Sequence, residues 1–137
     1  MAAPAARPAL AALAFAAAML VATGADAAHG ERKKGGGLSY TQLPTLTATV
    51  SKPDGRRGVL AVEVGVDVAD AALRTRAEQL GPVLRDAYLQ FLLTYAAALA
   101  PAQLPSADII GAGLQRATDR VLGRPGAVLL LSSILVN

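Results

Sequence analysis

The 137-residue chain contains no cysteine and no tryptophan, and its single histidine is His29. Without cysteine there is no disulfide, no thiol nucleophile and no thiolate ligand for zinc. His29 lies in a predicted N-terminal tether, where a lone histidine cannot form a triad or a metal site. No glycine-rich phosphate loop follows a predicted strand. We therefore expect a protein that is not an enzyme and that holds no cofactor and no metal.

Aromatic residues and net charge are also scarce. Aromatic residues make up 4% of the chain, and the formal net charge is only +3. Basic residues gather only at residues 32–34 and 56–57. No basic stripe with interleaved aromatic residues appears, so we expect no nucleic-acid partner.

Residues 1–27 have the order of a secretory signal. Arg7 precedes an apolar run at residues 9–22, and the small residues Ala25-Asp26-Ala27 follow it. The run is shorter than the roughly 20 residues that a transmembrane helix needs. We expect cleavage after Ala27 and export to the periplasm or to the periplasmic face of the inner membrane. The alternative is a short uncleaved anchor, against which the basic residues 32–34 argue through the positive-inside rule.

Residues 28–39 are charged and glycine-rich, which predicts a flexible tether. One interpretation is a spacer that keeps the following domain near the membrane, with residues 32–34 close to anionic lipid. The other is a disordered N-terminus of the mature protein. Residues 40–137 have the length of one domain. Because that domain has no disulfide, its aliphatic core must stabilise it alone.

Two strands with period-two alternation are expected at the start of this domain. In residues 45–51, threonine or serine alternates with aliphatic residues, and in residues 58–68 five aliphatic side chains share one face. Lys52-Pro53-Asp54-Gly55 has turn chemistry, so the strands should form an antiparallel hairpin. One face of the sheet should then be buried, and the other left to water or to a partner.

Helical spacing begins at Asp70 and continues for about 30 residues across Gly81-Pro82. Because proline kinks or breaks a helix, we expect one kinked helix or two nearly coaxial helices. A second helix is expected from the N-cap Ser106 to about Leu122. Gly123 and the following proline should end it.

A last strand is expected at residues 127–136. Its first half is apolar on both faces, which favours a central strand covered by helices. The order β-β-α-α-β predicts an α+β fold, with a small, mainly antiparallel sheet and two helices packed on one of its faces.

The candidate binding residues lie on the predicted strands. Glu63 and Asp67 share a strand face, but four residues of strand separate them by about 13 Å. A glycosidase carboxylate pair needs roughly 5 to 9.5 Å, so we interpret both as part of an exposed, partner-binding face. Residues 45–51 are expected at a sheet edge, where Thr45, Thr47 and Thr49 are available to a neighbouring strand.

Several short runs resemble the periplasmic domain of the flagellar basal-body-associated FliL family. Tyr40-Thr41-Gln42-Leu43-Pro44 stands at the entry to the first strand, and the valine-rich residues 60–70 end in an acidic residue at a helix start. Residues 82–89 (PVLRDAYL) match the family's proline, Arg-Asp and following leucines, and a final strand comes last. The resemblance covers residues 40–137.

Two features depart from the family pattern. A short alanine-rich signal replaces the strong transmembrane helix, so cleavage would remove the permanent anchor. The last strand has Leu129-Leu130-Leu131-Ser132 where the family often has an aromatic residue and threonine.

The resemblance implies a stomatin-like (SPFH-like) domain that supports motility. It would bind flagellar stator or basal-body proteins near the membrane, and its own copies as a homo-oligomer. Two alternatives stay open. One is a periplasmic adaptor with the same fold and no flagellar role. The other is a small-ligand carrier with a pocket between the kinked helix and the sheet, near Tyr88 and Tyr95.

Overall fold

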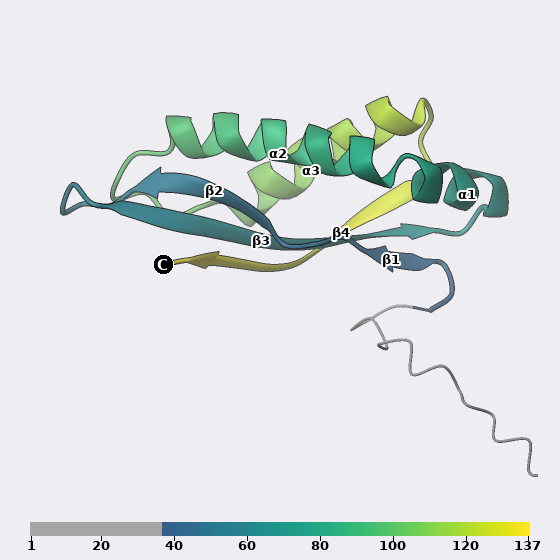
Figure 1. Cartoon of the computed structure of the whole chain (residues 1–137), viewed down its shortest axis with the longest axis horizontal. Helices are drawn as coiled ribbons and strands as arrows, with labels where there is room; N and C mark the ends of the chain where they lie inside the picture. The colour runs from purple at the N-terminus through teal and green to yellow at the C-terminus, as the bar shows by residue number, and fades with distance from the viewer. Residues whose placement is uncertain (1–36) are drawn as a thin grey trace, which may run out of the picture. The chain divides into compact units, whose positions relative to one another are not determined.

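The computed structural model describes residues 37–137, which form an α+β unit of four strands and three helices (Figure 1). All three helices lie on the same side of the sheet. The predicted signal at residues 1–27 and most of the predicted tether lie outside the described residues. In chain order the elements are β1 (Tyr40–Gln42), β2 (Leu46–Ser51), β3 (Arg57–Val68), α1 (Ala71–Gln79), α2 (Gly81–Ala98), α3 (Ala107–Leu122) and β4 (Ala127–Val136).

The sheet is antiparallel throughout, and β3 is its central strand. β1 and β2 follow one another along one edge of β3, and β4 pairs along the other edge. The predicted hairpin between β2 and β3 is confirmed, and Gly55 takes the positive φ of 78° that its turn requires. Every strand therefore depends on β3 for its backbone pairing.

Local capping signals set the helix ends. The Asp70 carboxylate accepts a hydrogen bond from the Leu73 N–H at 2.9 Å, and Ser106 Oγ accepts one from the Ile109 N–H at 3.3 Å. Gly123 ends α3 in the left-handed region at φ 80°. The predicted helix starts at Asp70 and Ser106 and the stop at Gly123 are confirmed.

The helical break at Gly81-Pro82 is also confirmed. α1 ends at Gln79 and α2 begins at Gly81, with the proline in the first turn of α2. Proline is tolerated there because the first-turn N–H groups have no partner inside a helix. The result is two helices in place of one kinked helix.

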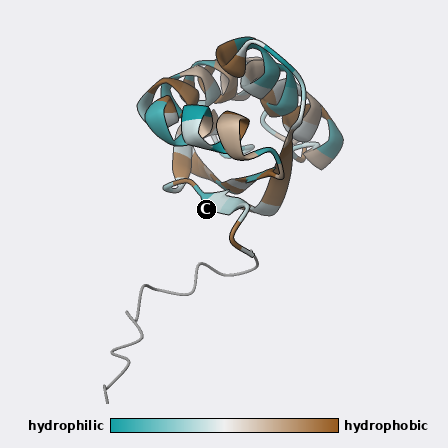
Figure 2. Cartoon of the chain, turned by 90° about the vertical axis from the view of Figure 1, so that its right-hand side faces the viewer, coloured by the Kyte–Doolittle hydropathy of each residue, from teal (hydrophilic) through white to brown (hydrophobic). Residues whose placement is uncertain are grey.

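The helices lie over one face of the sheet (Figure 2), and the buried side chains of the core lie between the two layers. The predicted aliphatic face of β3 is buried, and α2 and α3 contribute apolar residues that pack against it. The buried residues of these three elements that are almost completely inaccessible are Leu60, Val62, Val64, Val66, Val68, Leu84, Tyr88, Leu92, Ile110, Leu114 and Leu122. None of the helices in residues 37–137 is long and apolar enough to span a membrane.

Three features of the strands differ from the sequence predictions. β4 is an edge strand, not a central one, and Val128 and Leu130 are 53% and 41% exposed. β1 was not expected, because three residues are too few to show an alternating pattern. Thr45 also lies just before β2 and not within it.

Candidate binding surface

The face of the sheet opposite the helices, termed the open face, brings together four of the five predicted binding residues. Residues paired directly across an antiparallel ladder project to the same face. Thr49 pairs with Val59 and Thr47 with Ala61, and on β3 these positions alternate with the buried ones. Glu63 and Asp67 follow on the same face of β3. Thr45 is exposed beside this group, outside the ladder.

Large aliphatic side chains border the acidic residues on this face. Leu135 pairs with Ala61, Leu130 with Gly65 and Val128 with Asp67. Leu135 is 57% exposed, and Val59 on β3 is 45% exposed. Scattered exposed aliphatic residues are ordinary, but a group that shares one sheet face is typical of an interaction site. Sequence reasoning missed the β4 part because it placed β4 under the helices.

Asp67 carries the clearest polar signal on the open face. Its side chain is half-buried, and its Oδ1 atom is buried with no hydrogen-bond partner among the described residues. Tyr40 pairs with Asp67 across the ladder, and the Tyr40 ring lies over Gly65, which leaves no room for a side chain there. A buried carboxylate oxygen without a donor is costly.

The two edges of the sheet differ in how their backbone is protected. Along one edge, Leu43-Pro44-Thr45 separates β1 from β2, and proline has no N–H to offer a new strand. β4 on the other edge has no proline and no charged residue over its ten residues, but a β-bulge at Ser132 interrupts its ladder with β3. Only its beginning is covered within the described residues. The Gln115 side chain accepts from the Leu129 N–H at 2.8 Å and donates to the Ala127 carbonyl at 2.8 Å.

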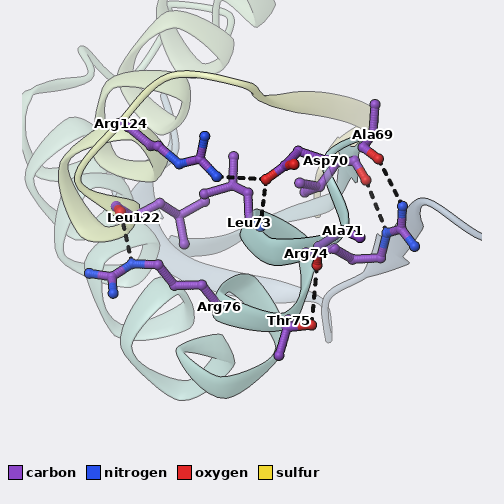
Figure 3. A network of polar contacts seen from close by, with 10 residues as sticks. Ala69, Asp70, Ala71, Leu73, Arg74, Thr75, Arg76, Leu122 and Arg124 are labelled. Atoms are coloured by element: carbon purple, nitrogen blue, oxygen red, sulfur yellow. Dashed lines mark hydrogen bonds and ion pairs between the residues drawn. The ribbon is translucent and has the colours of Figure 1, made fainter.

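A network of polar contacts connects the turn before β4 with the residues that follow β3 (Figure 3). The Asp70 carboxylate accepts from Arg124 Nη2 at 2.6 Å as well as from the Leu73 N–H. These two bonds hold the pKa of Asp70 below its ordinary value. Arg76 Nε donates to the Leu122 carbonyl at 2.9 Å, which ties α1 to the end of α3. The turn that leads into β4 is therefore positioned by charged groups.

The two tyrosines that were expected near a ligand pocket make hydrogen bonds within the helical layer instead. The Tyr88 and Thr118 hydroxyls are 2.5 Å apart in the buried contact between α2 and α3, and burial raises the pKa of Tyr88. The Tyr95 hydroxyl accepts from the Ser106 N–H at 2.8 Å.

An apolar cavity of about 200 Å³ does lie under the helical break, away from these tyrosines. Its walls come from β1, β3, α1 and the start of α2, and Arg74 and Glu78 are its charged residues. The remaining lining residues are Thr41, Leu43, Val66, Val68, Ala77, Gly81 and Leu84. This cavity lies between the broken helix and the sheet, and neither Tyr88 nor Tyr95 lines it.

Within residues 37–137, no three histidine, cysteine or acidic side chains are placed to hold a metal ion. No protein-family model and no curated protein matches this chain. The geometry of the described residues is consequently the direct evidence for what the domain does.

Proposed function

We propose that this chain is an exported, non-enzymatic protein of the flagellar basal body that acts by binding stator or basal-body proteins. The observation that carries the binding role is the open face, where the partly exposed Glu63 and Asp67 lie among exposed aliphatic side chains. The flagellar assignment comes from the FliL-like runs within residues 40–137. In this proposal the domain contributes to motor function and its loss leaves the filament intact.

The chemistry of the open face specifies the partner surface. Glu63 and Asp67 call for lysine or arginine donors, because charge-assisted hydrogen bonds are the strong ones. The neighbouring Val128, Leu130 and Leu135 call for apolar side chains around those donors. A partner with a basic and aliphatic surface fits both requirements.

A deletion strain tests the flagellar role. Swimming in soft agar should fall while filaments counted by microscopy stay normal, and the full gene should restore swimming. Normal swimming at ordinary and raised viscosity would contradict the flagellar role and leave a periplasmic adaptor of the same fold. Intact mass of the exported protein from the strain complemented with the full gene tests cleavage after Ala27.

Charge reversal tests whether the open face is the surface that binds the partner. The variant Glu63→Lys/Asp67→Lys should fail to restore swimming, because it repels a basic partner surface. The matched control is Asp86→Lys on the exposed side of α2, which should restore swimming. Equal recovery by both variants, at equal protein levels, would exclude the open face as the binding surface.

The cavity under the helical break supports a second candidate function, the carriage of a small apolar ligand. A volume of about 200 Å³ is enough for a small ring or short chain, with Glu78 at its wall for a polar end, whereas Arg74 already donates to the Val68 and Ala69 carbonyls. Gly81 lines this cavity, and a Cβ atom added there meets no atom within 4 Å.

Native mass spectrometry of the purified protein tests this second function. A bound ligand should appear on the wild-type chain and be reduced in Gly81→Leu, which adds a bulky side chain to the cavity wall. Gly111→Leu is the matched control, because Gly111 also has open space around it but lies in α3. A wild-type mass without ligand would remove the carrier function.

A further inference from the structure

A groove of about 490 Å³ opens to solvent between α2 and α3, and it is termed the helix groove. Its walls include Gln90 and Thr94 on α2 and Arg116 and Arg120 on α3, and all four side chains are exposed. The helix groove shares no residue with the open face or with the cavity under the helical break. It is therefore a separate surface on the helical side of the domain.

The aromatic part of the helix groove is held in place by the packing of the two helices. The Phe91 ring lies against Gly113 and occupies the space that a Cβ atom would need there. Phe91 also stacks on Tyr95, with the ring centroids 6.1 Å apart, and the Tyr95 hydroxyl accepts from the Ser106 N–H. A side chain that enters the groove therefore meets an apolar ring in a fixed position.

The α3 wall of the helix groove is positively charged. Arg116 and Arg120 are four residues apart, so they project from neighbouring turns on the same face of α3. Within residues 37–137 neither arginine belongs to an ion pair, and no acidic residue lines the groove. The neighbouring Asp119 accepts instead from the Gln115 amide. Because like charges at this spacing repel, an anion bound beside both arginines lowers the electrostatic energy of the wall.

The α2 wall supplies neutral hydrogen-bonding groups. The Thr94 hydroxyl donates to the Gln90 carbonyl at 3.0 Å, which sets its orientation. The Gln90 side-chain amide, one turn earlier on the same wall, has two N–H donors. Guanidinium and amide donors on facing walls are complementary to carboxylate oxygens.

We infer that the helix groove binds an acidic segment of a partner protein, through two carboxylates about one helical turn apart. Arginine binds a carboxylate with two parallel hydrogen bonds, and carboxylates on neighbouring turns match the spacing of Arg116 and Arg120. A membrane surface fits less well, because lipid-binding clusters contain about four to eight basic residues and this groove has two. A single oxyanion would leave most of the groove unfilled.

This second interface goes beyond the binding role proposed for the open face. The open face, with Glu63 and Asp67, calls for a basic partner surface, whereas the helix groove calls for an acidic one. The domain can therefore contact two partners of opposite charge, one on each side of its sheet. The inference does not depend on the flagellar role.

Fluorescence polarisation of two labelled peptides with the purified full chain tests the inference. Both probes are acetylated and amidated, and their cores are EAAAE and QAAAQ. The acidic probe should bind with a dissociation constant on the order of 10 µM to 1 mM at low salt and weaken as salt rises. The neutral probe should bind about tenfold more weakly or not at all.

Single substitutions locate the binding surface. Arg116→Gln and Arg120→Gln should each weaken binding of the acidic probe about fivefold or more, because each removes a charged donor. Arg85→Gln is the matched control, since it removes one exposed positive charge from α2 outside the groove. It should leave binding unchanged. All three variants should keep the thermal midpoint of the wild-type protein, because the substituted side chains are exposed.

Three outcomes would overturn the inference. The first is an equal loss of binding in Arg85→Gln and Arg120→Gln, which would show a response to net charge alone. The second is equal affinity for the acidic and neutral probes. The third is saturable binding of inorganic phosphate, or of vesicles that contain phosphatidylglycerol, by a chain that does not bind the acidic probe.

Discussion

The two edges of the sheet differ in what hinders their backbone N–H and C=O groups from pairing with another strand. The β1–β2 edge is divided by Pro44, and its longer strand alternates small polar residues with aliphatic ones. The β4 edge is mostly aliphatic. One glutamine from α3 covers its first part, and a β-bulge at Ser132 interrupts its second part. The comparison teaches that protection is local. Pro44, Gln115 and the bulge at Ser132 each act on one part of an edge.

The largest expected loss of stability comes from Gly65→Val, which disturbs β1 on its edge of the sheet. The new side chain would meet the Tyr40 ring, so β1 must shift away from β3. We expect a loss of about 1–3 kcal/mol in the free energy of unfolding, measured by denaturant titration. Amide exchange should accelerate at residues 40–42 and stay slow in β4.

Gly111→Val is the matched control for that substitution, because its added side chain enters open space. It should leave the free energy of unfolding nearly unchanged. An equal loss in both variants would show that the effect arises from valine itself and not from contact with Tyr40.

A smaller effect is expected from Gln115→Ala, which removes the covering group from β4. Two hydrogen bonds to the strand backbone disappear, so we expect a loss of about 1–2 kcal/mol. The Leu129 amide, which loses its acceptor, should exchange faster than in the wild-type protein. Gln90→Ala, on the exposed side of α2, should change neither quantity.

The pH dependence of stability should separate the contribution of the ionised Asp70 from that of a neutral capping side chain. The pKa of Asp70 is lowered by the Leu73 N–H and by Arg124, so the ionised form favours folding. Its contribution is therefore present above the ordinary aspartate pKa and is lost as pH falls through the lowered value. Asp70→Asn keeps a capping side chain and should remove this part of the acid dependence, measured by thermal melts at several pH values.

The smallest effect is expected at the hairpin turn of the other edge. Arg56 and Asp54 form an exposed ion pair at 2.6 Å, with side-chain exposures of 79% and 45%. Water screens such a pair, so Arg56→Ala should leave the denaturation midpoint within measurement error. A clear shift would mean that this turn controls β2–β3 pairing more strongly than its exposure indicates.

Most of the layered fold could be predicted from the sequence because local physics determines it. Asp70, Ser106 and Gly123 set helix ends through their own backbone and side-chain chemistry. The position of β4 could not be predicted, since aliphatic residues on both faces suit a buried strand and an interaction edge equally.

The same distinction holds for the candidate site. The shared face of Glu63, Asp67, Thr47 and Thr49 follows from the two-residue period of a strand. The contribution of Gln115 could not be predicted, because a glutamine inside a helix gives no pattern that reveals a distant backbone partner.

The central position of β3 also has a consequence for the order of folding. β2 adjoins β3 along the chain, whereas β4 reaches it only after three helices have been made. Pairing between segments distant in sequence is slow, so the edge of β3 that binds β4 stays unpaired for part of the folding reaction. During that interval the β4 segment of a neighbouring molecule presents the same residues in the same order. Refolding at high protein concentration therefore favours exchange of β4 between molecules, and dilution favours its return to its own sheet.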